Sequence, residues 1–185
     1  TAIQELLDNC EINSALVVAP KKVAETTWTT EASKWNHLHA LHVVKVLGTG
    51  RQRIDALNTD ADVYVTGRDN FVWLAGYYNG RLPYDVIVID ELTSFKSNKS
   101  QRFKAMRLAS ANVKRVIGLT GTPAPNGLLD LWAQMYCIDG GQRLGRSIGK
   151  YRDAYFDLRR WNNIVVKATL KKGAEQVIRD KIADI

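Results

Sequence analysis

The sequence predicts an α/β fold in which a doubly wound, mostly parallel sheet is flanked by helices. Short β-branched runs recur along the chain, and several of them are apolar on both faces, as strands covered on both sides must be. Segments with helical periodicity lie between successive runs, which is the order of a parallel α/β sheet. After the last of these runs the pattern changes, and it predicts a C-terminal helical extension.

The elements follow from this pattern in chain order. The amino end carries an apolar stripe of Ala2, Ile3, Leu6 and Leu7 with no capping signal before Thr1, so we expect more chain to precede it in a parent protein. Strands are expected at residues 15–18, 43–46, 63–66, 86–89 and 116–119. Helices are expected between them at residues 23–35, 51–58, 69–79 and 100–111. The extension is expected to hold helices at 128–136, 148–156 and 174–184 and a strand at 164–170.

Composition narrows the class of protein. With 185 residues, 45% of them apolar, the chain can bury one ordinary core. No window approaches a membrane span and the amino end has no export signal, so we expect no membrane partner. Cys10 and Cys137 belong to no ligand pattern, which argues against structural zinc or a disulfide framework. A reducing cytoplasm, bacterial or phage-infected, is the expected location.

Basic residues are unevenly placed along the chain, which has a formal net charge of +7. No acidic residue lies between Glu91 and Asp130, where the cations are Lys96, Lys99, Arg102, Lys104, Arg107, Lys114 and Arg115. Charge alone leaves two interpretations open, a solvated helix face and a surface for a polyanion such as DNA.

An acidic pair, Asp90 and Glu91, directly follows the apolar run at residues 86–89. Ligands of open α/β sheets bind at the carboxyl ends of the strands. A magnesium ion on nucleotide phosphates needs a carboxylate fixed there, and an attacking water needs an acceptor beside it. The pair is therefore a candidate catalytic and metal site, although a surface Asp-Glu turn has the same sequence.

The next expected strand ends in a loop that contains Thr120, Gly121 and Thr122, followed by Pro123 and Asn126. Two hydroxyls and a glycine beside the acidic pair would suit a segment that senses nucleotide phosphate. A plain Pro/Gly turn is the alternative.

Two further strand ends carry cations or small polar residues. The first expected strand runs into Pro20, Lys21 and Lys22, and the third ends in Thr66, Gly67 and Arg68. Lysines at a strand end that opens a helix would suit a DNA phosphate.

Four segments together resemble motifs Ia, Ib, II and III of Swi/Snf-type ATPases in helicase superfamily two, in the same order and at similar spacing. They are residues 16–22 with Trp28, residues 63–70, residues 86–91 with Lys96 and Ser97, and residues 118–123 with residues 126–132. The likeness is greatest to the compact proteins of phages and prophages. It implies a RecA-like ATP-binding lobe at residues 1–138 and a family-specific extension toward a second lobe at 139–185.

The resemblance also implies roles for individual residues. Asp90 would hold Mg²⁺ through water, and Glu91 would orient the water that attacks ATP. Thr120, Gly121 and Thr122 would couple the nucleotide state to movement of the lobes. Residues near the backbone of double-stranded DNA would be Pro20, Lys21, Lys22, Thr66, Gly67, Arg68 and Asn126. The second RecA-like lobe of the same parent chain would supply arginine fingers.

The sequence departs from the family pattern in two places. Thr93 stands where the family often has histidine, and the phosphate-binding pattern Gly-x-x-x-x-Gly-Lys-Ser/Thr is absent. Residues 145–151 resemble that pattern but have one residue too few between the glycines and end in Tyr151. We therefore expect a fragment of an ATP-dependent translocase that is inactive in ATP hydrolysis by itself.

Two other functions stay open from the sequence. One is a strand-separating or restriction-associated helicase of the same superfamily, and the other is a DNA-binding or interaction module without ATPase activity. The tryptophans at positions 28, 35, 73 and 132 fall in expected helices, which favours packing over stacking on bases.

Overall fold

A single parallel sheet forms the centre of the molecule. The computed structural model describes residues 1–121, 124, 127–162 and 164–185. Its five-stranded sheet has the order β2-β3-β1-β4-β5, and every neighbouring pair is parallel. The strands are β1 (Ala15–Ala19), β2 (Val43–Val46), β3 (Val63–Gly67), β4 (Val86–Asp90) and β5 (Arg115–Leu119). The expected parallel α/β sheet is therefore confirmed.

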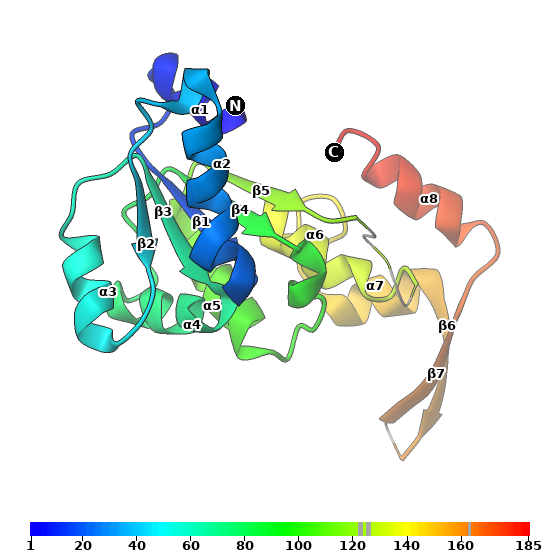
Figure 1. Cartoon of the computed structure of the whole chain (residues 1–185). Helices are drawn as coiled ribbons and strands as arrows, with labels where there is room; N and C mark the ends of the chain where they lie inside the picture. The colour runs from blue at the N-terminus through cyan, green and yellow to red at the C-terminus, as the bar shows by residue number, and fades with distance from the viewer. Residues whose placement is uncertain (122–123, 125–126, 163) are drawn as a thin grey trace.

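Helices cover both faces of this sheet (Figure 1). One face carries α1 (Ala2–Asp8) and α2 (Trp28–Lys34), the latter entered through a π-helical segment, Val23–Thr27. The other face carries α4 (Arg68–Tyr77), α5 (Gln101–Ala109) and α6 (Leu131–Asp139). The short helix α3 (Gly50–Leu57) joins β2 to β3.

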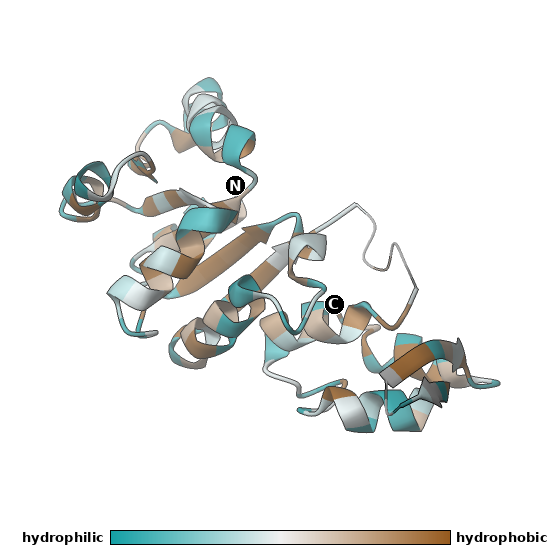
Figure 2. Cartoon of the chain, turned by 90° about the horizontal axis from the view of Figure 1, so that it is seen from below, coloured by the Kyte–Doolittle hydropathy of each residue, from teal (hydrophilic) through white to brown (hydrophobic). Residues whose placement is uncertain are grey.

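Alternation along the strands explains why both faces need cover. In β4, Ile87 and Ile89 pack into the core under α4 and α5, whereas Val86 and Val88 pack into the core under α1 and α2. All four side chains are buried. Figure 2 shows the hydrophobic strands lying between the helices on either side. A strand with two apolar faces is stable only in such a sandwich.

The extension packs on the same core as the sheet. It contains α7 (Ile148–Tyr155), β6 (Phe156–Trp161), β7 (Ile164–Leu170) and α8 (Ala174–Lys181). Tyr151, Phe156 and Ile178 are buried in the hydrophobic cluster that also holds Ile87 and Ile89. The Tyr151 hydroxyl donates to the carbonyl of Leu128 at 2.7 Å.

The strand β6 is a correction to the sequence-based expectation, which ended a helix at residue 156 and placed no strand between that helix and the strand expected at residues 164–170. Residues 156–161 pair antiparallel with β7, with a register shift between Arg159 and Arg160. Three of these six residues are charged, so the alternation of apolar side chains is too short to identify a strand without its partner. The resulting hairpin projects beyond α7 (Figure 1).

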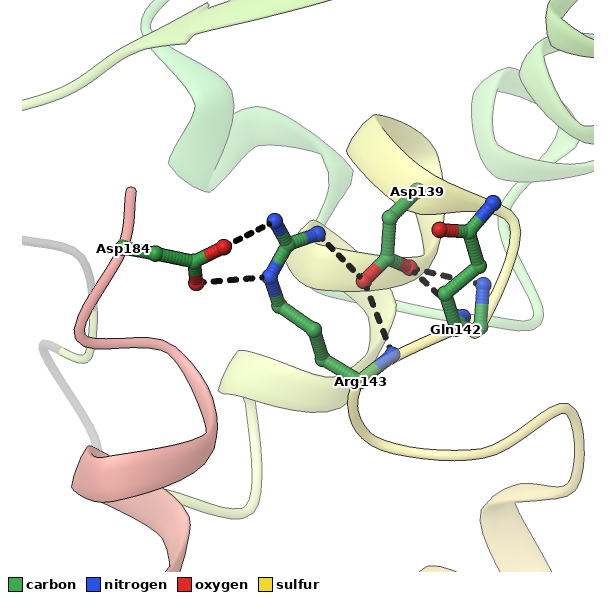
Figure 3. Close-up of polar contacts among 5 residues, drawn as sticks. Asp139, Gln142, Arg143 and Asp184 are labelled. Atoms are coloured by element: carbon green, nitrogen blue, oxygen red, sulfur yellow. Dashed lines mark hydrogen bonds and ion pairs between the residues drawn. The ribbon is translucent and has the colours of Figure 1, made fainter.

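A cluster of polar contacts fixes the loop after α6 to the end of the chain (Figure 3). The carboxylate of Asp139 accepts hydrogen bonds from the backbone nitrogens of Gly141, Gln142 and Arg143. The Arg143 guanidinium contacts Asp139 at 3.3 Å and Asp184 at 2.7 Å. Hydrogen bonding to Arg143 lowers the pKa of Asp184, and the same pair raises the pKa of Arg143.

A search of the described residues for a helix long and apolar enough to cross a membrane finds none.

Candidate functional site

The acidic pair lies at the carboxyl end of a strand that is buried on both faces. Asp90 is the last residue of β4, and its carboxylate is partly buried. The indole N–H of Trp28, at the start of α2, donates to Asp90 Oδ2 at 3.2 Å. Asp90 is therefore held from two sides, by its strand and by the helix that covers one face of the sheet.

Glu91 connects the ends of two neighbouring strands. Its Oε1 accepts a hydrogen bond from the Thr93 hydroxyl and a second one, at 3.5 Å, from the Thr120 hydroxyl. The register of β4 and β5 sets Asp90 beside Leu119, which brings the following residues, Glu91 and Thr120, together. The structure thus joins the acidic pair to the first residue of the loop that the sequence singled out.

The backbone of Glu91 is in the left-handed region, with φ of 67°. A residue with a Cβ pays a conformational cost there, and such strain gathers at functional sites. This conformation turns the chain sharply at the strand end, and a short 3₁₀ segment, Leu92–Phe95, follows. The turn directs the buried side chains of Leu92 and Phe95 into the core below the site.

Gly118 makes room for this turn. A Cβ built at Gly118 would lie 2.6 Å from Leu92 Cδ2 and 3.3 Å from Ile138 Cδ1. The strand β5 can therefore approach the segment after Glu91 only because residue 118 has no side chain. The glycine is a packing requirement of the site.

The donor set of the pair suits a magnesium ion that also binds phosphate. Within the described residues, Asp90 Oδ1 and Glu91 Oε2 accept no hydrogen bond. In the same residues there is no group of three or more His, Cys, Asp or Glu side chains that could hold a metal ion. Mg²⁺ is usually bound by one or two carboxylates, with phosphate oxygens and waters completing its shell. Two carboxylates fit that arrangement.

Basic residues lie along the same edge of the sheet. Lys21 and Lys22 follow β1 and are exposed, and Arg68 opens α4 directly after β3. A pocket of about 400 Å³ is lined by Lys21, Gly67 and Arg68, together with Asn70 and Arg102. Two carboxylates that line this pocket form ion pairs with its cations: Glu25 lies 3.9 Å from Lys21, and Asp69 lies 3.1 Å from Arg102.

One of the residues expected to contact DNA, Thr66, lies inside the sheet instead. Thr66 is fully buried, and its hydroxyl donates to the carbonyl of Val46 at 3.0 Å. The strand β3 continues through Gly67, so Thr66 is an interior residue of the sheet and its side chain cannot reach DNA. Pro20 is half-buried beside Lys21, and Gly121 is exposed. Thr122 and Asn126 lie outside the described residues.

Two contributors to this edge escaped the sequence analysis. The contact of Trp28 with Asp90 was missed, although a partly buried indole N–H commonly finds an acceptor. Arg53 of α3 was also missed. It stacks 4.0 Å above the Trp73 ring and donates to Asn70 Oδ1 at 3.2 Å, which fixes a lining residue of the basic pocket.

A second, apolar pocket of about 300 Å³ lies between α1, α2 and the sheet. Its lining includes Trp28, Trp35, Leu38 and Leu119, and Glu31 is its one titratable side chain among the described residues. This pocket is lined mainly by apolar side chains, which cannot take part in a reaction, so the acidic edge beside it is the better candidate for catalysis.

Parallel strands covered on both faces, with an acidic pair after one strand and a threonine after its neighbour, define a RecA-like ATPase lobe. The chain matches the SNF2-related domain over residues 3–141 and belongs to that family.

Similar proteins come from a phage and from eukaryotes. The putative protein p41 of Acyrthosiphon pisum secondary endosymbiont phage 1 is 40% identical over 163 residues, which are 84% of this chain and 35% of the phage protein. Helicase SWR1 of Mycosarcoma maydis is 33% identical over 127 residues, which are 66% of this chain and 7% of that protein. The chain therefore spans about a third or less of the length of these relatives.

Solved structures support the same assignment. The SWI2/SNF2 ATPase core of Sulfolobus solfataricus in complex with double-stranded DNA superposes with a TM-score of 0.70 at 26% identity. The match covers 83% of this chain and 30% of that one. The fold is thus a RecA-like part of an Snf2-type ATPase core.

Proposed function

We propose that this chain is the part of an ATP-dependent double-stranded-DNA translocase of the Snf2 type that carries the carboxylates for magnesium and water, together with a stretch of the DNA path. The observation that carries the proposal is the hydrogen bond from Thr120 to Glu91 at the carboxyl edge of the sheet. It links the acid that would act on water to the loop that would sense the nucleotide.

Each side chain of the edge has a proposed task. Asp90, oriented by Trp28, would hold a magnesium ion through water, and Glu91 would accept a hydrogen bond from the attacking water. Bound Mg²⁺–ATP would supply the phosphoryl group and the charge that the two carboxylates balance. Thr93 and Thr120 fix the Glu91 carboxylate on one oxygen and leave the other one for water. Gly121 and Thr122 would continue the coupling segment.

Lys21, Lys22 and Arg68 would contact phosphates of duplex DNA, and Pro20, Gly67 and Asn126 would contribute to the same contact. Two features support this proposal, the exposure of both lysines and the opening of α4 at Arg68. Phosphate contacts carry no sequence information, so movement along DNA needs only this kind of contact. The second lobe of the intact protein would complete both the DNA path and the nucleotide site.

This chain alone would not hydrolyse ATP. Its 185 residues contain no Gly-x-x-x-x-Gly-Lys-Ser/Thr pattern to hold the phosphates. An arginine finger is worth ~10³–10⁵ in rate, and it would come from the second lobe. Phosphate release by the purified chain should stay at background with duplex DNA present. DNA-stimulated release that Glu91→Gln abolishes would show that the chain is a complete enzyme.

Binding to duplex DNA tests the rest of the proposal. The variant Lys21→Gln/Lys22→Gln/Arg68→Gln should bind a labelled duplex more weakly, and the slope of log affinity against log salt should fall by up to about 0.9 for each lost phosphate contact. The matched control is Lys34→Gln/Arg81→Gln/Lys114→Gln, whose side chains lie toward the amino ends of the strands. Equal weakening by the two variants would contradict the proposed path.

A further inference from the structure

The β6–β7 hairpin consists of two unequal halves. In the half next to α7, Phe156 is buried, and Leu158, Ala168 and Leu170 pack against the core. Lys171 fastens this base by donating to the carbonyls of residues 153 and 154 at 2.6 and 3.3 Å. The base of the hairpin is therefore part of the folded body.

The far half, residues 159–162 and 164–167, projects away from that body (Figure 1). Trp161 is 72% exposed and Val166 is 57% exposed. Trp161 lies beyond the register shift between Arg159 and Arg160, and Val166 lies opposite that shift. Both residues belong to the hairpin that projects past α7 (Figure 1). An isolated two-stranded hairpin is marginally stable in water, and an exposed tryptophan at its end adds no packing energy. Exposed large apolar side chains gathered at one place are typical of an interaction surface.

Its charge identifies the kind of partner. No acidic residue lies between Asp157 and Glu175, where the cations are Arg159, Arg160, Lys167, Lys171 and Lys172. Arg159 and Lys167 are direct cross-strand partners, an arrangement of like charges that destabilises a hairpin. Within the described part of the chain, neither side chain has a carboxylate at ion-pair distance. A polyanion would remove this repulsion.

We propose that Arg159, Trp161 and Lys167 form a second contact to duplex DNA, separate from the carboxyl edge of the sheet. Arg159 and Lys167 bind phosphates on the same strand of DNA or across a groove, and Trp161 packs against the sugars at the end of the contact. The inference rests on the proposed function in one respect, the choice of duplex DNA as the polyanion. A protein partner is the alternative, but two exposed apolar side chains provide little area for one beside so many cations.

The salt dependence of DNA binding tests this contact. Arg159→Gln/Lys167→Gln should weaken binding of a labelled duplex by the 185-residue chain and lower the salt slope by roughly 1.8, or about 0.9 for each phosphate. The control Lys34→Gln/Arg81→Gln removes the same charges toward the amino ends of the strands and should leave the slope unchanged. Both pairs lie on the surface, so thermal unfolding should show that both variants remain folded.

Tryptophan emission provides a second readout. The emission change of the wild-type chain on adding duplex should largely disappear in Trp161→Phe. It should persist in Trp35→Phe, whose ring is 55% exposed in another part of the molecule.

The DNA-binding measurements distinguish the hairpin contact from the DNA contact proposed at the carboxyl edge of the sheet. If the hairpin variants bind DNA as the wild type does while Lys21→Gln/Lys22→Gln/Arg68→Gln binds weakly, the proposed hairpin contact is wrong and the proposed contact at the carboxyl edge is supported. The reverse pattern supports the hairpin contact and contradicts the edge. No duplex binding by the wild-type chain would overturn both.

Discussion

The carboxyl edge of the sheet and the β6–β7 hairpin both present charged side chains, but the edge is tightly packed and the far half of the hairpin is exposed. Asp90 ends a strand whose residues 86–89 are buried, and Trp28, Thr93 and Thr120 hold the acidic pair in place. Among the residues that the structure describes, none makes a side-chain hydrogen bond or ion pair with Arg159 or Lys167. Chemistry at a phosphorus atom needs groups placed to a fraction of an ångström, whereas contact with a DNA backbone needs only charge within reach.

The largest expected difference between the two regions is in packing. Val88→Ala in β4 should lower the free energy of unfolding by about 2–3 kcal/mol, since it removes two buried methyl groups and leaves a cavity. Val166→Ala in the hairpin makes the same chemical change at a 57% exposed site and should stay within about 0.5 kcal/mol. Urea unfolding of both variants measures the contrast. Equal losses would mean that the hairpin is as well packed as the sheet.

A second prediction concerns Asp139, which ties the end of α6 to the extension. Asp139→Ala should cost about 2 kcal/mol, because hydrogen bonds to a charged group contribute ~1.5–3 kcal/mol and their donors would lose a partner. Asp184→Asn removes the exposed partner of Arg143 and should cost less. Urea unfolding of both single variants and the double variant measures their coupling. An Asp184→Asn loss as large as that of Asp139→Ala would contradict this order.

A smaller effect should depend on pH. The backbone N–H of Asn13 and the ammonium of Lys114 lower the pKa of Asp85 at the amino end of β4. A lowered folded-state pKa contributes stability above the unfolded-state value of about 3.9, and this contribution is lost as pH falls through the folded-state pKa. Asp85→Asn should therefore be less stable than wild type by about 1 kcal/mol at pH 7, with the difference closing as pH falls from 7 through the folded-state pKa. Thermal melts across this range measure it, and a constant difference would contradict the assignment.

The sheet was predictable because its strands carry their own signal, apolar runs bounded by turns. The contact between Glu91 and Thr120 could also be predicted from the sequence, since the ends of neighbouring parallel strands lie together. The contact between Trp28 and Asp90 could not be predicted, because it depends on where α2 lies across the sheet. Thr66 was misplaced because the strand runs one residue further than expected, and β6 was missed because its pattern needs β7 beside it.

We propose that Asp90 and Glu91, joined to Thr120, form the metal-binding wall of a nucleotide site. Nuclear magnetic resonance of the labelled chain titrated with Mn²⁺ and ATP tests it directly, because bound Mn²⁺ broadens the amide signals nearest to it. The amides of residues 90–93 and 118–121 should broaden before the others, and Asp90→Asn/Glu91→Gln should abolish this preference. Broadening centred on other carboxylates, or unchanged in that variant, would show that the acidic pair does not bind the metal.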